Sequence, residues 1–361
     1  MTRTFTMQDE EKNAAQAEML GNRLAKRSRH LKKWARRTGV EVFRLYDRDI
    51  PEIPLVLDYY AGAISGALYE RPYEKDEEEE QHWLAAMTEA VSASLDIPRD
   101  RIFLKQRRRQ RGKAQYQKQG ERQLIREIRE GGLRFRVNLS DYLDTGFFPD
   151  RRKMRSLVGK EAAGRGVLNL FCYTASFSVY AAAGGAARVD SVDLSNTYLD
   201  WGAVNFDLNG FRAERLNSGD FFRFHGSSEG SGQARPDIEA GPLGGKGPPP
   251  HRLIRGDVLP FLDAAATARL SWDIIILDPP AFSNSKKMSG ALDLRRDHRE
   301  LICRCLALLN PGGKLWFSAN PRHFKLFPED FPGAVIEDMG PLIIDEDFQG
   351  RKIPLCFTFR V

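Results

Sequence analysis

The second half of the chain alternates short apolar segments with longer segments whose apolar residues recur at helical spacing. Apolar runs without polar alternation are typical of strands buried on both faces of a parallel sheet. The segments that predict strands are 167–171, 188–194, 274–277, 314–318, 331–335, 343–344 and 355–359. The segments that predict helices are 175–183, 196–209 and 292–309. This alternation predicts an α/β fold from Gly166 onward, with a doubly wound, Rossmann-like parallel sheet.

The first third of the chain has a different pattern. Four large apolar residues recur at helical spacing among basic residues, which predicts a basic amphipathic helix ended by Gly39. These residues are Leu20, Leu24, Leu31 and Trp34. Strands are expected at 40–46, 55–60, 102–104, 134–137 and 142–143, and a second helix is expected to start in the acidic run 74–80. We therefore expect a smaller N-terminal α+β domain over residues 1–150 and the α/β domain over residues 151–361.

Residues 217–250 interrupt the α/β pattern with a stretch rich in Gly, Ser and Pro. Such a composition cannot bury enough apolar surface to fold alone, so we predict a mobile surface insertion. An aspartate follows a similar Arg-Leu pair at each end of this stretch, Asp220 at the first and Asp257 after the second. Either one can follow the third strand of the domain. We prefer Asp257, because the short helix 260–266 then leads directly into the next strand.

A carboxylate follows the most apolar of the predicted strands. Asp278 comes directly after Ile274–Leu277, and Pro279 and Pro280 end the strand there. Ligands of open α/β sheets bind at the carboxyl ends of the strands, and two prolines stiffen the loop that carries Phe282. We therefore predict that this loop holds a flat substrate. An ordinary strand end with a capping aspartate is the alternative interpretation.

A second acid lies at the end of another predicted strand. Asp193 follows Asn169 by 24 residues, close to the spacing at which an acid binds the ribose hydroxyls of a nucleoside. The loop Phe171–Thr174 lacks the glycine-rich turn that a pyrophosphate requires. A dinucleotide is therefore disfavoured, and a nucleoside without phosphates, such as S-adenosylmethionine, fits better. Asp150 and Arg152 place opposite charges before a helix, either as a linker ion pair or facing a zwitterionic ligand.

Positive charge is concentrated in the first third of the chain. The 361 residues include 55 Lys and Arg against 49 Asp and Glu, which gives a formal net charge of +6. Eight basic residues and no acid lie between Arg23 and Arg37, and seven basic residues and no acid lie between Arg101 and Lys113. Such clusters indicate the phosphate backbone of a nucleic acid as partner. A solvated helix face and a solvated loop are the alternative.

Several other classes of protein are disfavoured. No apolar run approaches the ~20 residues of a membrane span, and the first residues lack the apolar segment of a secretory signal. We therefore expect a cytoplasmic protein without a membrane partner. The four cysteines show neither a disulfide framework nor the paired spacing of a zinc site, so we predict no metal site. The sequence leaves the oligomeric state open.

Together, these residues resemble the class I S-adenosylmethionine-dependent methyltransferases. More narrowly, the chain resembles the RlmK half of the bifunctional RlmKL family, which methylates guanine N7 in 23S ribosomal RNA. The resemblance covers roughly residues 18–361 apart from the insertion. It is carried by Asn22-Arg23-Leu24, Lys33-Trp34-Ala35-Arg36, Tyr46-Asp47, Asp144-Thr145-Gly146, Asn169-Leu170-Phe171-Cys172-Tyr173-Thr174, Asp193-Leu194-Ser195, and Asp278-Pro279-Pro280 with Phe282-Ser283-Asn284-Ser285-Lys286.

The resemblance implies a site for the cofactor S-adenosylmethionine at the edge of the sheet. The implied cofactor contacts are Asp150, Arg152, Asn169, Phe171, Tyr173, Thr174, Asp193, Leu194, Asp257 and Val258. Within this set, Asp193 would bind the ribose and Asp257 the exocyclic amine of adenine. The catalytic residues that would border the target base are Asp278, Pro280 and Phe282.

Two positions depart from the pattern of the family. Ala175 stands where glycine is usual, which crowds the loop after the first strand, and Pro149 with Arg151 alters the motif around Asp150. The other methyltransferase half of the bifunctional family and its RNA-binding domain are missing from this sequence. We therefore expect a single activity.

The implied substrate is 23S ribosomal RNA or a precursor of the large subunit, with guanine N7 as the expected target. Guanine N7 carries a lone pair and has no proton to lose, so its methylation requires in-line alignment more than a general base. We expect the base to be swung out of its helix, because enzymes that act on bases generally require this.

Three alternative functions are weighed against this one. A cytosine-C5 methyltransferase of the same fold needs a cysteine nucleophile, and the segment Phe317–Asn320, where related enzymes carry it, has none. A non-catalytic RNA-binding or ribosome-assembly protein is disfavoured by the intact Asp193 and Asp278. An NAD-dependent oxidoreductase is disfavoured by the missing glycine-rich turn.

Overall fold

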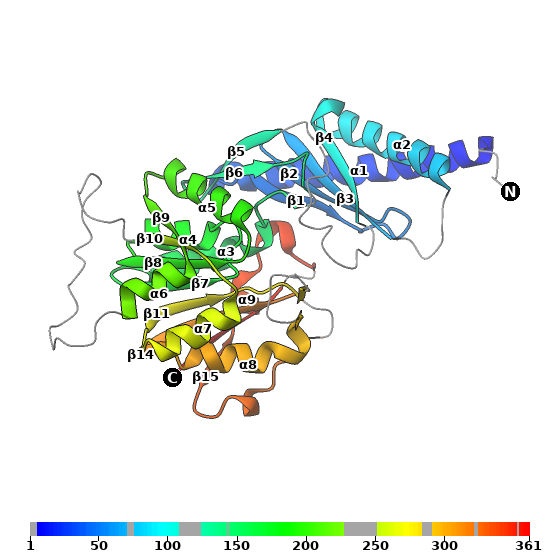
Figure 1. The fold of residues 1–361 in the computed structure, drawn as a ribbon. Helices are drawn as coiled ribbons and strands as arrows, with labels where there is room; N and C mark the ends of the chain where they lie inside the picture. Colours follow the sequence, from blue (N-terminus) through cyan, green and yellow to red (C-terminus); the bar gives the residue numbers. More distant parts are fainter. Residues whose placement is uncertain are drawn as a thin grey trace. The chain divides into compact units, whose positions relative to one another are not determined.

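The computed structural model divides the chain into two compact units (Figure 1). Unit 1 comprises Met1–Gly132, Val137–Thr145 and Glu346–Arg351, and unit 2 comprises Leu133–Arg136, Gly146–Asp345 and Lys352–Val361. The structure describes residues 6–70, 76–107, 124–142, 144–226, 251–283, 291–320, 324–351 and 354–361. The main change of unit, at Gly146, lies near the boundary expected at residue 150, whereas the sequence pattern does not predict that Glu346–Arg351 joins unit 1.

Helix α1, Met7–Thr38, carries the basic amphipathic pattern. It begins with a capping box between Thr6 and Asp9 and ends at Gly39, whose φ of 66° lies in the left-handed region. The apolar residues expected to face inward are all buried, namely Leu20, Leu24, Leu31 and Trp34. The amphipathic helix is therefore confirmed, and it begins well before the apolar pattern does.

A four-stranded sheet packs with α1 and helix α2, Glu77–Leu95, in one hydrophobic core. Its order is β1-β2-β3-β4, with β1 Val42–Asp47, β2 Leu55–Tyr60, β3 Ala63–Tyr69 and β4 Ile102–Arg107. The first three strands are antiparallel, and β4 is parallel to β3 because α2 carries the chain back along the sheet. The expected α+β architecture is confirmed, although the sequence pattern does not predict β3.

A separate two-stranded sheet is formed by β5 Ile125–Glu130 and β6 Leu133–Asn138. Tyr142, which the pattern places in a closing strand, lies in a bend instead. The neighbouring Leu143 lies outside the described residues.

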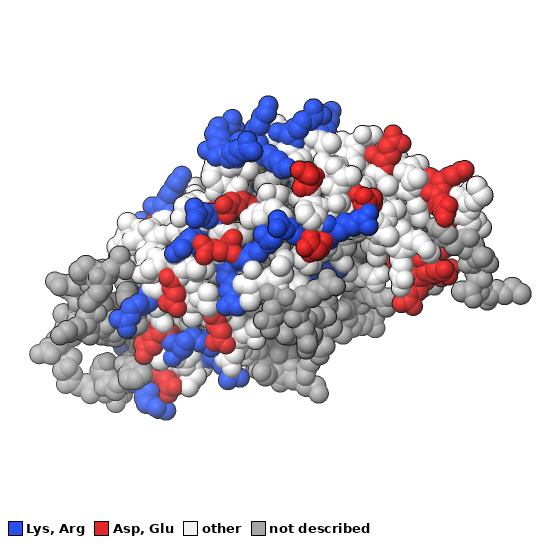
Figure 2. All heavy atoms as spheres, turned by 90° about the horizontal axis from the view of Figure 1, so that it is seen from above, with Lys and Arg blue, Asp and Glu red and all other residues white. Residues whose placement is uncertain are grey.

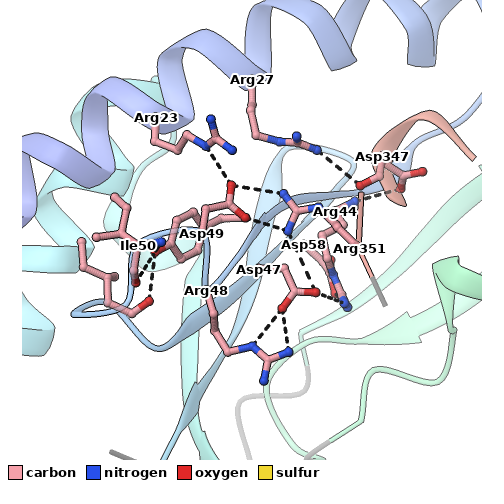
Figure 3. Close-up of polar contacts among 12 residues, drawn as sticks. Arg23, Arg27, Arg44, Asp47, Arg48, Asp49, Ile50, Asp58, Asp347 and Arg351 are labelled. Carbon is pink, nitrogen blue, oxygen red and sulfur yellow. Dashed lines mark hydrogen bonds and ion pairs between the residues drawn. The ribbon is translucent and has the colours of Figure 1, made fainter. Parts of the chain in front are cut away.

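A network of arginines and aspartates joins α1, β1 and the segment Glu346–Arg351 within unit 1 (Figure 3). Arg351 pairs with Asp49, with Nη1 3.1 Å from Oδ1. Asp347 is 0% exposed and accepts a hydrogen bond of 3.0 Å from the backbone N–H of Arg44. A segment from near the end of the chain thus completes the polar interior of unit 1.

Unit 2 is built on an eight-stranded sheet of order β15-β16-β14-β11-β7-β8-β10-β9. Its strands are β7 Gly166–Leu170, β8 Arg188–Asp193, β9 Ala213–Asn217, β10 His251–Arg255, β11 Trp272–Leu277, β14 Leu309–Ala319, β15 Val335–Asp338 and β16 Leu355–Arg360. The strands from β14 to β9 in this order are parallel, and β16 is antiparallel to β14 and β15. The chain order reverses between β11 and β7, which makes this pair the topological switch point.

Helices pack against the sheet of unit 2 as expected for a doubly wound, Rossmann-like fold (Figure 1). They are α3 Arg152–Glu161, α4 Ser176–Ala183, α5 Asn196–Leu208, α6 Ser218–Gly226, α7 Val258–Thr267, α8 Leu294–Leu306 and α9 Gly340–Ile343. Residues of α6, α7 and α8 share one apolar core with the sheet, including Phe221, Phe261 and Leu301. The helices in the described part of the chain include none with the length and apolar character that crossing a membrane requires.

Four expectations for unit 2 need correction. The strand expected over 331–335 begins only at Val335, as β15. Residues 218–226, expected within the mobile insertion 217–250, form α6 because Phe221 gives this segment an apolar anchor; residues 227–250 lie outside the described part. Ile343 ends the short helix α9 rather than starting a strand. The helix expected over 292–309 is shorter, because β13 Leu292–Asp293 precedes it and β14 takes its end.

Candidate active site

The candidate active site lies in unit 2, at the carboxyl ends of β7, β8, β10 and β11. These strands are parallel neighbours, so the loops that follow them leave the sheet at one edge. Asp193 ends β8, Asp257 follows β10, and Asp278 follows β11. The structure therefore places the three acids singled out from the sequence along the same edge of the sheet.

The loop after β7 has an unusual backbone. Phe171, Tyr173 and Ala175 adopt φ of 54°, 53° and 60° without being glycine. Each such residue costs about 1–3 kcal/mol and persists only where the surroundings fix it. One fixing contact is the hydrogen bond of 3.0 Å from the N–H of Cys172 to the carbonyl of Val192. The positive φ at Ala175 explains why glycine is usual there, and strain of this kind is typical of functional loops.

Asp193 is held by backbone donors from two loops. Its Oδ2 accepts a hydrogen bond of 2.9 Å from the N–H of Tyr173, and its Oδ1 accepts one of 2.9 Å from the N–H of Ser195. Burial raises the pKa of Asp193 to about 6, although the hydrogen bonds from Ser195, Tyr173 and Leu194 act in the opposite direction. A carboxylate offers about four lone pairs, and three backbone donors use part of them, so this acid can still accept a hydrogen bond from a ribose hydroxyl.

Aromatic rings surround Tyr173 beside this acid. The centroid of the Tyr173 ring lies 5.2 Å from that of Phe148 and 4.4 Å from that of Tyr198. Phe148 is 41% exposed, whereas Tyr198 is buried. Sequence reasoning does not single out Phe148 or Tyr198, because no spacing in the chain links either of them to Tyr173. The rings give the edge next to Asp193 an apolar surface that suits a flat ligand.

Two of the residues proposed to contact the cofactor have side chains engaged inside the protein. The hydroxyl of Thr174 donates to the carbonyl of Gly146 at 2.7 Å, and the amide of Asn169 donates to the hydroxyl of Ser178 at 2.8 Å. Both side chains are buried. The neighbouring Phe171 and Leu194 are partly exposed, so a contact from these two is compatible with the structure.

Arg151 binds Asp278, a contact that the sequence does not reveal. Its Nε and Nη2 donate to Oδ2 and Oδ1 of Asp278 at 2.9 and 2.8 Å, which makes a bidentate ion pair. The side chains are only 10% and 18% exposed. Burial lowers the pKa of Arg151, but the carboxylates of Asp278 and Asp150 more than offset this effect and raise it above its usual value. Asp278 is thus held in place by a permanent positive charge.

Asp150 and Arg152 have different partners. Oδ2 of Asp150 lies 3.3 Å from Nη1 of Arg151, while its Oδ1 is buried and has no hydrogen-bond donor among the residues that the structure describes. An unpaired buried carboxylate oxygen is costly, so its placement favours a ligand that brings a donor. Nη1 of Arg152 donates to Asp345 at 2.9 Å. Asp150 can therefore accept a hydrogen bond from a cationic group of a ligand, whereas Arg152 is already paired with an acid of the protein.

The loop after Asp278 presents an exposed aromatic residue. Pro279 is buried and Pro280 is partly exposed, while Phe282 is 56% exposed. Phe282 lies in the short strand β12, Phe282–Ser283, which pairs with β13. The carbonyl of Ala281 also accepts a hydrogen bond of 3.1 Å from the N–H at the start of α8. The loop therefore holds an exposed ring on a fixed backbone, as stacking on a base requires.

Asp257 and Asp220 both follow strands, but β10 is the neighbour of β8 and β9 lies one strand further out. The N–H of Gly256 donates to the carbonyl of Asp193 at 3.1 Å, which ties the two strand ends together. Asp257 is the N-cap of α7, and its Oδ1 accepts a hydrogen bond of 3.4 Å from the N–H of Leu259. Val258 is 3% exposed. These positions favour Asp257 over Asp220 as the acid next to Asp193.

A thiol lies close to the ion pair of Arg151 and Asp278. Cys356 on β16 is the register partner of Ser318 on β14 and is 0% exposed. Burial raises the pKa of Cys356 to about 12, and Arg151 and Asp278 act on it in opposite directions. A buried, protonated thiol is a poor nucleophile, so its presence does not favour cytosine-C5 chemistry. No group of three or more metal-binding side chains occurs in the ranges that the structure describes.

Comparison with known proteins assigns this architecture to one kind of enzyme. A family model for S-adenosylmethionine-dependent methyltransferases matches residues 42–230. The chain is 42% identical over 339 residues to ribosomal RNA large subunit methyltransferase K of Neisseria meningitidis, covering 94% of this chain and 86% of that protein. It is 41% identical over 348 residues to ribosomal RNA large subunit methyltransferase K/L of Methylococcus capsulatus, covering 95% of this chain and 42% of that protein.

Solved structures share the fold. The structure of SMU.776, complexed with SAH, has a TM-score of 0.68 at 21% identity and covers 96% of this chain and 82% of its own. The methyltransferase from Agrobacterium tumefaciens has a TM-score of 0.52 at 18% identity and covers 84% and 86%. At these identities the likeness concerns the arrangement of the elements.

Proposed function

Because the chain belongs to the family of S-adenosylmethionine-dependent methyltransferases, we propose that it methylates 23S ribosomal RNA of the large subunit at guanine N7. The single observation that carries the substrate is the 42% identity, over 94% of the chain, to a ribosomal RNA large subunit methyltransferase K. The substrate would be 23S ribosomal RNA or a precursor of the large subunit, and the reaction would take place in the cytoplasm. The site geometry supports the chemistry in two respects, one for the cofactor and one for the base.

The residues at the strand ends fit the cofactor. When bound, S-adenosylmethionine supplies an electrophilic methyl group. Asp193, whose carboxylate can accept beyond its three backbone donors, would accept a hydrogen bond from the ribose, and Asp150 Oδ1, which lacks a donor in the described structure, would accept one from the ammonium of the methionine end. Asp257 at the neighbouring strand end would accept from the amine of adenine. Phe171, Tyr173, Leu194 and Val258 would provide the apolar surroundings.

The residues after β11 fit a base that loses no proton. A carboxylate held through both oxygens by Arg151 is placed to accept hydrogen bonds from a base, not to take up a proton. Guanine N7 needs no general base, because its lone pair is already available. Asp278 would accept from the donor edge of guanine, and the exposed ring of Phe282 would stack on it.

Mapping of methylated nucleotides tests this function. Ribosomal RNA from cells with and without the protein is digested and analysed by mass spectrometry, and the purified protein is then added back with S-adenosylmethionine. We expect one 7-methylguanosine of 23S RNA to disappear and to be restored by the wild-type protein, but not by an Asp193→Ala variant. Loss of a 5-methylcytidine, or of no modification, would contradict the proposal.

A further inference from the structure

The basic residues of α1 divide into two rows that face different surroundings. On the inner row, Nε of Arg23 lies 2.8 Å from Oδ2 of Asp49, and Nη2 of Arg27 donates to the carbonyl of Asp347 at 3.3 Å (Figure 3). These two arginines belong to the ion-pair network of unit 1. Their guanidinium groups are therefore engaged by acceptors of the protein itself.

The outer row, which we call the basic face, has no such balance. It consists of exposed residues at positions i, i+3, i+7, i+10 and i+11, which share one side of the helix: Lys26, Arg29, Lys33, Arg36 and Arg37. Arg29 reaches back to the carbonyl of Ala25 in its own helix, and the others form no ion pair with any acid in the described part of the chain. In Figure 2, Lys and Arg side chains gather in one dense group with few Asp and Glu side chains around it.

The fold itself does not account for this face. The dipole of the helix favours cations in the last turn, which explains Arg36 and Arg37 but none of the earlier residues. Like charges four positions apart destabilise a helix, and Arg29, Lys33 and Arg37 form two such pairs in succession. The arrangement therefore costs stability in the free protein, and a polyanion would relieve that cost.

A second element extends the basic face beyond the end of α1. The N–H of Glu41 donates to the carbonyl of Arg129 on β5 at 3.1 Å, and the N–H of Arg129 donates to Oε2 of Glu41 at 2.7 Å. This pairing fixes the exposed Arg129 two residues beyond Gly39, where the helix ends. A neighbouring strand thus adds an exposed cation close to the end of α1.

The chemistry of the face favours a phosphate backbone over a protein partner. Protein interfaces generally have an apolar or aromatic centre. The only large apolar side chains exposed on α1 are Met7 and Met19, which lie nearer its start than any residue of the basic face. Cations without such a centre are typical of contacts to phosphates, which position a nucleic acid without reading its sequence.

From these observations we infer that the basic face of α1, extended by Arg129, binds the phosphate backbone of the RNA substrate. The inference rests on the proposed function for the identity of the RNA. It adds the surface that holds the RNA and the residues that form it. This surface belongs to unit 1, whereas the proposed site of methyl transfer belongs to unit 2.

The test compares two variants that lose the same charge. The first replaces three residues of the basic face, Lys26→Gln, Lys33→Gln and Arg37→Gln. The second replaces three exposed lysines elsewhere that have no ion-pair partner in the described structure, Lys12→Gln, Lys160→Gln and Lys325→Gln. Glutamine retains a good helix propensity, so α1 is kept in both. Binding to a 23S RNA transcript and to an RNA duplex of unrelated sequence is measured from about 50 to 200 mM salt.

Each phosphate contact contributes about 0.7–0.9 to the slope of log affinity against log salt. We expect the first variant to lose about 2–3 from that slope and on the order of 10- to 100-fold in affinity for both RNAs at low salt. The second variant should keep the slope of the wild type. Equal losses in the two variants, or no loss in the first, would overturn the inference.

Two further measurements distinguish this inference from a protein-binding role of the basic face and from failure of the proposed function. If the first variant binds RNA normally but no longer binds large-subunit particles, the basic face contacts a protein and the inference is wrong. S-adenosylmethionine binding, measured by calorimetry, should be equal in both variants and the wild type. If the wild-type protein methylates no RNA, the proposed function fails, while the salt dependence still decides whether this face binds RNA.

Discussion

Asp193 links the charge state of one residue to cofactor affinity. Burial raises its pKa to about 6, so about one carboxyl in eleven is ionised at pH 5. Ribose hydroxyls bind best to the ionised form, because it accepts hydrogen bonds with both oxygens. We therefore expect the dissociation constant for S-adenosylmethionine to be about tenfold higher at pH 5 than at pH 7.5. Calorimetric titration at half-unit intervals of pH measures this.

The matched variant is Asp193→Asn, which keeps the shape of the side chain and removes its titration. It should bind S-adenosylmethionine weakly at every pH between 5 and 7.5. A wild-type affinity that stays constant over this range would argue against Asp193 as the ribose acid. The sign for stability is opposite to that for binding: the raised pKa stabilises the free fold at low pH, and this stabilisation is lost as the pH rises through about 6.

Arg151 is expected to act as a positioning residue for Asp278. Arg151→Ala would leave that carboxylate without its bidentate partner, and a displacement of the base by about 1 Å costs on the order of 100-fold in rate. Arg151→Lys retains the charge but cannot donate two parallel hydrogen bonds, so its rate should lie between those of Arg151→Ala and the wild type. Single-turnover methylation of 23S RNA measures the rate.

A structural role alone would affect cofactor binding as well. Arg151→Lys keeps a positive charge beside both Asp278 and Asp150, so its S-adenosylmethionine affinity should stay within about threefold of the wild type, a difference of less than about 0.7 kcal/mol. The control is Arg296→Ala, which breaks the exposed ion pair with Asp297 and should leave the rate unchanged. A parallel fall in cofactor affinity and rate for Arg151→Lys would contradict the positioning role.

These residues also mark how far the candidate site can be predicted from the sequence. Asp193 and Asp278 are predictable, because each ends an apolar run and parallel strand ends share one edge. The partner of Asp278 is not predictable, because Arg151 lies 127 positions away and no periodicity connects the two. The hydrogen bond of Thr174 to Gly146 is hidden for the same reason. The local sequence pattern thus predicts where the acids lie. Which side chains remain available to a ligand depends on tertiary contacts, which the pattern does not show.

At the scale of the elements, two glycines differ in how much space surrounds them. Gly184 lies where two helices pack closely, and Gly21 lies where a side chain can be accommodated. A Cβ on Gly184, at the end of α4, would lie 1.9 Å from the carbonyl oxygen of Gly159 in α3. Its φ of −75° suits alanine, so the clash alone decides the effect. Gly184→Ala should therefore destabilise the protein by about 3 kcal/mol, because backbone atoms of two packed helices must separate.

Gly21, in the interior of α1, offers the opposite case. A Cβ there would meet Ser94 at 3.9 Å, an ordinary contact. Gly21→Ala should stabilise the protein by about 1 kcal/mol, because glycine is a poor helix former. Urea unfolding of both variants measures the two free energies. A stable Gly184→Ala protein would show that α3 and α4 are packed less closely than the structure has them.

Element prediction fails where packing, not pattern, selects the conformation. Strand β3 is missed because Ala63, Gly66 and Ala67 are weak strand formers. The structure uses Gly66 because a Cβ there would lie 2.4 Å from Leu104 and 2.7 Å from Leu57. The regular strands β7 and β11 are predictable, because short apolar runs of this kind are typical of strands buried on both faces of a parallel sheet.

At the scale of the whole molecule, the chain order does not match the units. Glu346–Arg351 belongs to unit 1, although the residues on both sides of it belong to unit 2. This segment contains Asp347, which is 0% exposed and contacts Arg44 and Arg27. A boundary predicted from composition divides the chain into two continuous segments. It therefore cannot reveal that a short segment of the second part folds with the first. The fold of unit 1 thus depends on residues about 300 positions beyond its first strand.

That dependence gives a prediction that spans the chain. Asp347→Ala removes the acceptor for the N–H of Arg44 on β1 and leaves the nearby arginines with one carboxylate fewer, which should cost about 2–4 kcal/mol. The loss should fall on unit 1, so hydrogen exchange should accelerate in β1 and β2 while the amides of β7 and β11 keep their protection. Glu346→Ala is the control, because its pair with His30, whose side chain is 67% exposed, should contribute little. Uniform acceleration in both units, or none in β1, would show that the segment only passes along unit 1 without stabilising it.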